Sequence, residues 1–248
     1  MKKKLLIAGG SGFLGTTITS IVKDYDYKVT SSYFSKIKNK NLKKYYKKFD
    51  FTKFNDCLLA TKNKDCLIMC AMVSAGLKAM SEQKVSDMVL KNIIIRSNIF
   101  EACRINNIKN IVWVSSATVY QPAKYPIKEK QLNLNLEPYN IYKSIGWGYR
   151  YIEKLAEYYN QNYNLNIKII RTSSIYGPYD NFDESKSHVI PALLKKALKQ
   201  ENPFIVWGNK KTIRDFVYSE DLAKAIIKLL KINKLNSPMN FSSGKECS

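Results

Sequence analysis

The sequence predicts an α/β protein built on a doubly wound parallel sheet, with a small, incomplete C-terminal substrate lobe. Two observations lead to this fold class. Short apolar stretches alternate with amphipathic stretches of helical period along most of the chain, an order that is typical of parallel sheets covered by helices on both faces. A glycine-rich segment follows the first apolar stretch, and ligands of such folds bind at the carboxyl ends of the strands.

The first apolar stretch, Leu5–Ala8, is expected to be a buried strand that leads into a glycine loop over residues 9–15. Its glycines are spaced three apart, which suits a tight turn, a close approach of the backbone to a pyrophosphate and close packing of helix on strand, as in Rossmann folds. Phosphates would bind free N–H groups at the helix start. A plain turn between strand and helix is the alternative. The cofactor-binding residues expected here are Gly9, Ser11, Gly12, Phe13, Leu14 and Gly15.

The second strand is expected over Tyr27–Ser32, after a helix over Thr16–Val22. In many dinucleotide folds an acid near the end of this strand binds the ribose hydroxyls of NAD. Here hydroxyl side chains follow instead, with Lys36 and Lys38 just beyond. Hydroxyls and lysines suit a 2′-phosphate, so the sequence favours NADP(H) over NAD(H). Ordinary loop charge is the alternative interpretation of the lysines.

The next elements complete one half of the sheet. A short third strand is expected at residues 48–51, where Asp50 and Phe51 would reach the adenine end of a dinucleotide. The fourth strand, Asp65–Ala71, is nearly all apolar, as expected for a central parallel strand covered on both faces, and Ala71 at its end would face the cofactor. Apolar residues of helical period then predict a long amphipathic helix over Val85–Cys103.

The remaining pattern continues the alternation of strands and helices. The fifth and sixth strands are expected at Ile111–Ser115 and Ile167–Arg171, and helices are expected from His188 and over Ser219–Leu230, with Ser219 as an N-cap. Further readable stretches are Phe204–Trp207 and Ile213–Tyr218. We expect residues 1–172 to form the dinucleotide-binding core. Residues 173–248 would add substrate-lobe segments and a returning core strand and helix.

Tyr139 and Lys143 are four residues apart, so on a helix they would share a face. An ammonium beside a phenol favours the phenolate, which makes the tyrosine usable as a general acid or base towards a carbinol or carbonyl. Ser116, at the end of the fifth strand, can hydrogen-bond the same oxygen. Together with the glycine loop, these residues indicate nicotinamide chemistry.

Composition limits the function classes. The net charge is +21, but the lysines are dispersed and no nucleic-acid-binding motif accompanies them, so a solvated basic surface is favoured over a nucleic-acid partner. The five cysteines form no C-x-x-C pair, which predicts no metal site and core thiols in a reducing cytoplasm. No apolar run has the length of a membrane helix.

Five motifs spread over nearly the whole chain carry a resemblance to a known family. They are GGSGFLG (9–15), VSSATVY (114–120), YNIYK (139–143), IYGP (175–178) and RDFVYSEDLA (214–223). The chain resembles the extended short-chain dehydrogenases/reductases of the NAD-dependent epimerase/dehydratase family, which act on nucleotide sugars. It is most similar to the GDP-L-fucose synthases, which epimerise a GDP-4-keto-6-deoxymannose at C3 and C5 and then reduce C4 with NADPH.

The resemblance implies a role for each matching residue. Ser116, Tyr139 and Lys143 would form the hydride-transfer triad, and Lys143 would also hold the nicotinamide ribose. His188, the only histidine, would be an acid/base residue of the sugar site, whereas without the resemblance a structural role is favoured. Lys196 and Arg214 also have a plain surface interpretation, and Asn181 would cap a loop or face substrate. The substrate-binding residues implied are Thr118, Asn181, His188, Lys196, Trp207 and Arg214.

Three departures limit this transfer. Thr118 stands where the family has a cysteine that serves the epimerisation, and a hydroxyl is a poor proton shuttle for a carbon acid; nucleotide-sugar 4-epimerases carry this pattern. Ser173 replaces an asparagine that often precedes the YGP loop. Residues 240–248 resemble the beginning of a longer sugar-nucleotide lobe, so a truncated chain is expected.

The sequence therefore predicts an NADP(H)-dependent enzyme that reduces C4 of a nucleotide-linked 4-keto-6-deoxy sugar, with GDP as the expected carrier. We expect a cytoplasmic homodimer with a nucleotide-sugar substrate and no membrane partner. A nucleotide-sugar 4-epimerase or dehydrogenase that retains NAD(H) is one alternative, and a non-catalytic dinucleotide-binding protein is another.

Overall fold

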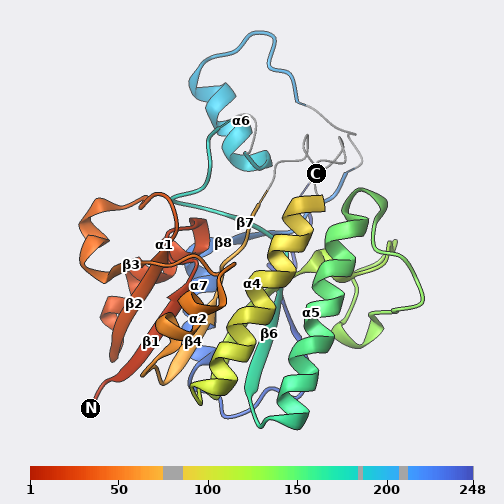
Figure 1. Cartoon of the computed structure of the whole chain (residues 1–248). Helices are drawn as coiled ribbons and strands as arrows, with labels where there is room; N and C mark the ends of the chain where they lie inside the picture. Colours follow the sequence, from red (N-terminus) through yellow and green to blue (C-terminus); the bar gives the residue numbers. More distant parts are fainter. Residues whose placement is uncertain (75–85, 184–186, 207–211, 248) are drawn as a thin grey trace.

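The computed structural model describes residues 1–74, 86–183, 187–206 and 212–247 (Figure 1). It contains a seven-stranded parallel sheet in the order β3-β2-β1-β4-β5-β6-β9, and β7 and β8 form a separate parallel pair. The strands are β1 (Lys3–Ala8), β2 (Tyr27–Tyr33), β3 (Tyr46–Lys48), β4 (Cys66–Met69), β5 (Asn110–Ser116), β6 (Asn166–Thr172), β7 (Ser174–Tyr176), β8 (Phe216–Tyr218) and β9 (Met239–Phe241).

Helices cover both faces of the sheet (Figure 1). The α-helices are α1 (Phe13–Ile21), α2 (Phe54–Thr61), α4 (Ser86–Ile105), α5 (Lys143–Asn162), α6 (Val189–Leu198) and α7 (Ser219–Leu229). The 3₁₀ turns are η1 (Val22–Asp24), η2 (Lys40–Tyr45), η3 (Ala117–Val119), η4 (Glu129–Gln131) and η5 (Asn140–Tyr142). This architecture confirms the predicted doubly wound Rossmann-type sheet.

The central strands divide their side chains between two apolar cores, because successive residues of a strand point to opposite faces. Leu6 and Leu67 lie in the core with residues of α2, α4 and α5, whereas Leu5 and Ile68 lie in the core with residues of α1 and α7. All four side chains are buried. Burial on both faces explains why these strands are apolar without alternation.

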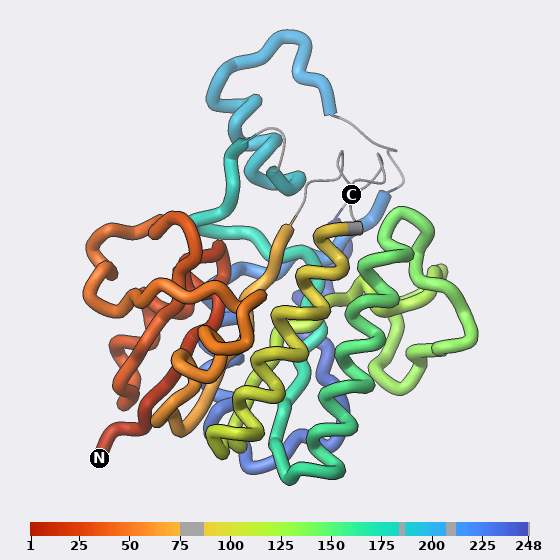
Figure 2. The backbone as a smooth tube through the Cα atoms, in the orientation of Figure 1, coloured from red at the N-terminus to blue at the C-terminus, as the bar shows by residue number. Residues whose placement is uncertain are grey.

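The strand order reverses at β1, since β2 and β3 lie on one side of it and β4 lies on the other. A reversal of this kind leaves a crevice at the carboxyl ends of the strands, which is where ligands of open α/β sheets bind. The glycine loop directly follows β1 and therefore lies at this crevice. Helix α6 stands above the same edge, apart from the helices that cover the faces (Figure 2).

The third strand lies earlier in the chain than the sequence pattern predicts, at Tyr46–Lys48. The aromatic pair that suggested a strand packs elsewhere, because Phe49 and Phe51 stack on each other at 6.1 Å between ring centroids and Phe51 is buried in the core. Asp50 accepts hydrogen bonds from Thr52 N and Oγ1, at 3.1 and 2.6 Å, which turns the chain towards α2.

Two further expectations are corrected near the C-terminal end of the described chain. Ser219 is the first residue of α7 and not its N-cap, which is Tyr218. Ser219 instead lies against Gly177, where an added Cβ would meet its Oγ at 2.3 Å. Residues 204–206 form no strand, and Trp207 lies outside the described residues. In the part of the chain that is described, no helix has the length and apolarity needed to cross a membrane.

Candidate functional site

The glycine loop is packed so tightly that a Cβ at Gly9 or Gly15 would meet backbone atoms well inside van der Waals contact. Gly9 has a φ of +81°, and a Cβ there would lie 2.5 Å from the backbone of Ala71. A Cβ on Gly15 would lie 2.1 Å from Gly9 O and 2.7 Å from Gly10 Cα. The loop is therefore pressed between α1 and the segment after β4, and Ala71 lies in direct contact with it.

Gly12 lies on the open side of this loop. It is exposed, and an added Cβ would have a single described neighbour within 4 Å, Gly9 O at 3.2 Å. Gly12 is also the N-cap of α1, whose described residues provide no side-chain cap and no acid in the first turn, where Phe13 and Leu14 lie. The first N–H groups of a helix have no intrahelical partner, so this end of α1 is suited to an anionic group.

The hydroxyl side chains at the end of β2 are already engaged by the fold. Ser32 Oγ accepts the N–H of Gly9 at 2.7 Å, and Ser31 Oγ lies 2.8 Å from Thr19 Oγ1 of α1. Ser11 N donates to Ser32 O at 3.0 Å. These contacts fix the glycine loop on β2, so the two serines are not free to face a 2′-phosphate as the sequence pattern suggested.

The two lysines after β2 are both exposed as residues, but the ammonium of Lys38 is engaged by the fold. Lys38 Nζ donates to Tyr179 O at 2.5 Å, and partial burial lowers the pKa of Lys38 from its ordinary value. Lys38 therefore joins this segment to the loop after β7. Of the two lysines, Lys36 is the better candidate for a cofactor phosphate.

Ser116, the last residue of β5, is held within the η3 turn. Thr118 N and Oγ1 donate to Ser116 Oγ at 3.2 and 3.0 Å. Helix α5 packs directly on this turn because Gly146 has no side chain: a Cβ there would lie 2.5 Å from Thr118 O and 2.6 Å from Pro138 Cβ. Gly146 thus brings the Ser116 turn and the Pro138–Tyr139 segment onto one turn of α5. Gly146 was not among the predicted site residues, because its role depends on contacts between segments that are distant in the sequence.

Tyr139 lies before α5 and not on it, which corrects the expected shared helical face. It has ψ of 131° and precedes the η5 turn, and α5 begins at Lys143. The chain is extended here because Pro138 is buried against Gly146. The Tyr139 side chain is 57% exposed, and Lys143 Nζ lies 3.2 Å from Glu137 Oε1. The η5 turn, rather than helical spacing, therefore relates the phenol to the ammonium.

A buried polar network supports the strand end that carries Ser116. Arg171 of β6 donates to Glu153 of α5 at 2.6 Å, and Ser115 Oγ donates to the same carboxylate at 2.7 Å. Arg171 also donates to Tyr120 Oη at 2.8 Å, and Tyr120 donates to Asn240 Oδ1 at 2.6 Å. All but Asn240 are buried. This network joins β5, β6, α5 and β9 directly below the turn.

The predicted sugar-site residues lie mostly on and around α6, above the sheet edge (Figure 1). His188 is the N-cap residue of α6, and its Nδ1 lies 3.5 Å from Asp180 Oδ1. Asn181 Oδ1 accepts Asp183 N at 3.0 Å, which is the loop-capping role that was one of its two expectations. Lys196 Nζ donates to Ile205 O at 2.7 Å.

Arg214 lies next to Asp215, a residue that was not predicted from the sequence to belong to the site. Arg214 pairs through its backbone with Cys247 in an isolated antiparallel bridge. Asp215 accepts hydrogen bonds from Ser243 N at 2.9 Å, Gly244 N at 2.7 Å and Ser173 Oγ at 2.8 Å. Partial burial opposes its charge, but these donors hold the pKa of Asp215 below its ordinary value. Ser173, one of the departures from the family pattern, thus has a structural partner.

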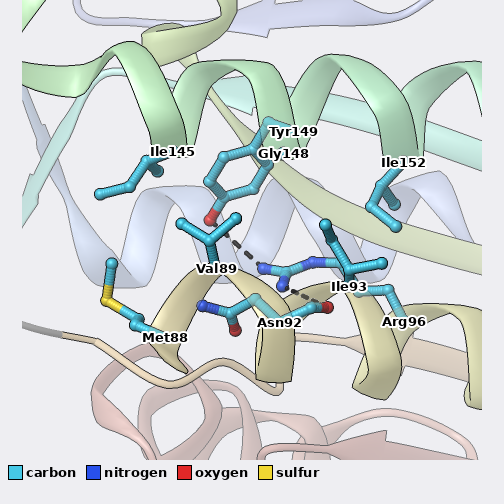
Figure 3. Close-up of a pocket in the computed structure, with 9 residues that line it drawn as sticks. All are labelled: Met88, Val89, Asn92, Ile93, Arg96, Ile145, Gly148, Tyr149 and Ile152. Carbon is cyan, nitrogen blue, oxygen red and sulfur yellow. Dashed lines mark hydrogen bonds between the residues drawn. The ribbon is translucent and has the colours of Figure 1, made fainter. Parts of the chain in front are cut away.

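A small cavity lies between α4 and α5, lined by the side chains in Figure 3. Asn92 of α4 accepts Val73 N at 2.9 Å and donates to Val73 O at 2.8 Å, so it fixes the segment after β4. Arg96 is buried and donates to Asn92 O at 3.0 Å and to Tyr149 Oη at 3.3 Å (Figure 3). Its guanidinium also lies 4.9 Å from the centre of the Tyr149 ring.

Comparisons with known proteins identify the family and agree with the fold. Residues 5–241 match the model of the NAD dependent epimerase/dehydratase family. A GDP-L-fucose synthase of Sinorhizobium fredii is 29% identical, over 99% of this chain and 76% of that protein. A putative UDP-glucose 4-epimerase of Methanocaldococcus jannaschii is 31% identical, over 98% of this chain and 78% of that protein. A UDP-N-acetylglucosamine 4-epimerase from Methanobrevibacter ruminantium M1 superposes with a TM-score of 0.85 and 25% identity, over 100% of this chain and 79% of that one.

Proposed function

The chain belongs to the NAD dependent epimerase/dehydratase family, and from this premise we propose that it is an NADP(H)-dependent reductase of a nucleotide-linked 4-keto-6-deoxy sugar. The sugar would be carried by GDP and used for a surface polysaccharide. One observation carries the proposal. Because Gly146 has no side chain, both the Ser116 turn and the Pro138–Tyr139 segment pack on α5, at the carboxyl end of a central strand. Likeness to a GDP-L-fucose synthase supports the sugar class.

The glycine loop fits the dinucleotide that this family uses. Gly9 and Gly15 leave no space for a Cβ, whereas Gly12 and the uncapped start of α1 are open on the other side. A diphosphate would bind the free N–H groups at the start of α1. Lys36 would face the 2′-phosphate, and Lys143 would hold the nicotinamide ribose. Asp50, Phe51 and Ala71 remain the expected neighbours of the adenine and nicotinamide ends.

When bound, the nicotinamide supplies a hydride to the C4 carbonyl. The protein's part is to place and protonate the carbonyl oxygen. Ser116 Oγ, fixed by Thr118, would donate to that oxygen and hold it in place. Tyr139 Oη would transfer its proton to the same oxygen as charge develops there. The Lys143 ammonium would stabilise the phenolate that remains.

The remaining polar groups would recognise the sugar and its nucleotide. His188 and Asn181 would contact the sugar, and Lys196, Trp207 and Arg214 would contact the nucleotide sugar's phosphates and base. Lys196 and Arg214 carry the positive charge that a diphosphate requires. Thr118 stands near the triad serine, at the position where the family has a cysteine that serves the epimerisation. A hydroxyl is a weak acid–base catalyst towards a carbon acid. We therefore propose reduction at C4 with little epimerisation at C3 and C5.

The deciding experiment offers GDP-4-keto-6-deoxymannose and NADPH to the protein in deuterated water. Loss of NADPH absorbance reports reduction, and deuterium at C3 or C5 of the product reports epimerisation. We expect NADPH consumption with little deuterium at either carbon. No NADPH consumption with this or related 4-keto sugars would refute the reductase, and full labelling at both carbons would refute the limited role given to Thr118.

Tyr139→Phe is the matching variant, because it removes one oxygen and keeps the ring that packs on Tyr142. We expect turnover to fall by roughly 10²–10⁴-fold, the usual range for loss of a general acid, with NADPH affinity changed less than about twofold. Stopped-flow absorbance and NADPH fluorescence measure the two quantities. Tyr142→Phe is the control and should turn over normally; unchanged turnover in Tyr139→Phe would remove that residue from the mechanism.

A nucleotide-sugar 4-epimerase that keeps NAD(H) between half-reactions is the second candidate. Likeness to a UDP-N-acetylglucosamine 4-epimerase and the threonine at position 118 favour it. Cofactor that stays bound through purification, with no net use of added NADPH, would identify this activity. Cofactor binding without turnover of any 4-keto sugar would instead indicate a non-catalytic dinucleotide-binding protein.

We also propose that the protein forms a homodimer through α4 and α5, which run side by side on one face (Figure 2). Large side chains on these helices stay exposed, including Leu90 and Ile105 of α4 and Tyr151 and Tyr158 of α5. Burying such side chains against a second copy is favourable by about 25 cal/mol per Å² of apolar surface.

A further inference from the structure

The segment that leads into α6 contains a buried carboxylate with one oxygen that accepts a hydrogen bond and one that accepts none from the described residues. The side chain of Asp180 is 3% exposed. Its Oδ1 accepts Asn181 N at 2.7 Å, whereas its Oδ2 is buried and has no hydrogen-bond partner among the residues that the structure describes. Lys38 is a cation that interacts with the Asp180 charge: burial lowers the pKa of Lys38, and the Asp180 charge raises it against that larger effect. A buried carboxylate oxygen without a donor still costs free energy, so a role for this oxygen in the site is indicated.

The carboxylate faces the single histidine of the chain. His188 Nδ1 lies 3.5 Å from Asp180 Oδ1. The imidazole is otherwise open, since the His188 side chain is 64% exposed. Nδ1 thus lies near a buried carboxylate, while most of the His188 side chain is exposed.

The position of Asp180 is fixed from both directions along the chain. Asp180 N donates to Gly177 O at 3.3 Å. The preceding residue, Tyr179, has a φ of +70° and is held by two side chains of the segment after β2: Lys38 Nζ donates to its carbonyl at 2.5 Å and Asn39 Nδ2 donates to its hydroxyl at 3.1 Å. Asp180 cannot easily turn away from His188 while these contacts hold.

We propose that Asp180 is a positioning residue that holds His188 in the tautomer with the proton on Nδ1, so that the Nε2 lone pair faces the sugar. A carboxylate beside one imidazole nitrogen keeps the proton there and makes the other nitrogen an acceptor. The inference rests on the proposed function and deepens it, because it gives the histidine a defined role. In that role, Nε2 accepts a hydrogen bond from a hydroxyl of the 4-keto sugar.

The test relies on the single histidine of the chain, whose two ring nitrogens give signals that no other residue shares. Long-range ¹H–¹⁵N NMR of ¹⁵N-labelled protein carrying a histidine-free affinity tag distinguishes the two neutral tautomers. At about pH 8.5, above the ordinary titration range of imidazole, we expect the Nδ1–H form to predominate in the unmodified protein. A predominance of the Nε2–H form would overturn the proposal without any variant.

Asp180→Asn then tests the cause, and Asp183→Asn removes the same charge from the same loop as a control. We expect Asp180→Asn to return His188 to the Nε2–H tautomer and to lower kcat for the 4-keto sugar by about 10-fold or more, by analogy with other residues that orient a functional histidine. Asp183→Asn should leave the tautomer unchanged, and Asp180→Glu should restore part of the Nδ1–H form. Circular dichroism and NADPH binding verify that each variant is folded.

The outcomes separate this inference from the proposed function. If no 4-keto sugar is turned over, the reductase proposal fails while the tautomer measurement still decides the role of Asp180. If the sugar is reduced but Asp180→Asn keeps both the tautomer and kcat of the unmodified protein, Asp180 is not a positioning residue.

Discussion

The two ends of the candidate site are held by different kinds of contact. At the cofactor end, backbone packs closely on backbone in addition to the Ser32 contact, since a Cβ on Gly15 would lie only 2.1 Å from Gly9 O. At the sugar end, side chains hold backbone, as where Asp215 accepts from Ser243 N and Gly244 N. Contacts between two backbone segments cannot be relieved by the rotation of a side chain. Hydrogen bonds from backbone to side chain, in contrast, can be exchanged for hydrogen bonds with a ligand. Substitutions should therefore affect global stability at the cofactor end and local order at the sugar end.

The largest effect is expected below the Ser116 turn, between the two ends, where Glu153 pairs with Arg171 and both side chains are at most 7% exposed. Glu153→Ala leaves a buried guanidinium without its carboxylate, which should lower the free energy of unfolding by about 3–5 kcal/mol. Glu157, one turn later on α5, pairs with Lys154 at the surface. Glu157→Ala should cost at most about 1 kcal/mol. Urea denaturation measures the free energy of unfolding of both variants. Equal losses would contradict the expected difference between the buried and the surface ion pair.

A smaller effect is expected within the glycine loop itself. Gly15→Ala places a methyl group against backbone, which should lower the free energy of unfolding by about 1–3 kcal/mol and weaken NADPH binding. Gly12→Ala introduces a single contact at 3.2 Å and has no positive φ, so its cost in stability should be well under about 1 kcal/mol. Thermal unfolding with and without NADPH compares the pair. If both variants unfold alike, backbone packing does not distinguish the two positions.

The smallest global effect is expected at the sugar end, for Asp215→Asn. The donors around Asp215 lower its pKa, so the carboxylate stabilises the fold above the ordinary pKa of an aspartate, and this contribution is lost as the pH falls through the lowered value. At neutral pH the variant should therefore exchange the amides of Ser243 and Gly244 about tenfold faster, a loss of roughly 1.4 kcal/mol that is confined to this segment. Hydrogen-exchange mass spectrometry of the 240–247 region checks this, and faster exchange throughout β1 and β4 would show that the effect is not local.

Local pattern was enough to predict much of the sheet. Apolar runs predicted β1, β4 and β5 within about two residues, and the glycine spacing predicted the loop after β1. The third strand was displaced because Phe49 and Phe51 look like strand residues but pack on each other and into the core. Local pattern carries no information about which buried surface an aromatic pair will fill.

The candidate site was predicted less completely, because its geometry depends on contacts between distant segments. Tyr139 was placed on a helix by its spacing from Lys143, yet the η5 turn separates them. The contact of Lys38 with Tyr179 joins segments far apart in the chain, and no sequence motif indicates this contact. The role of Gly146 likewise appears only when Thr118 and Pro138 are seen to meet at its Cα.

The polar network below Ser116 has a consequence for the order in which the protein can be made. Asn240 of β9 accepts a hydrogen bond from the Tyr120 hydroxyl, and this hydroxyl accepts a hydrogen bond from Arg171. Although β5 and β6 leave the ribosome much earlier, the network that supports the strand end cannot close until translation has passed residue 240. Until then, the β6 edge of the sheet is unpaired and the nascent chain exposes a strand edge that could pair wrongly.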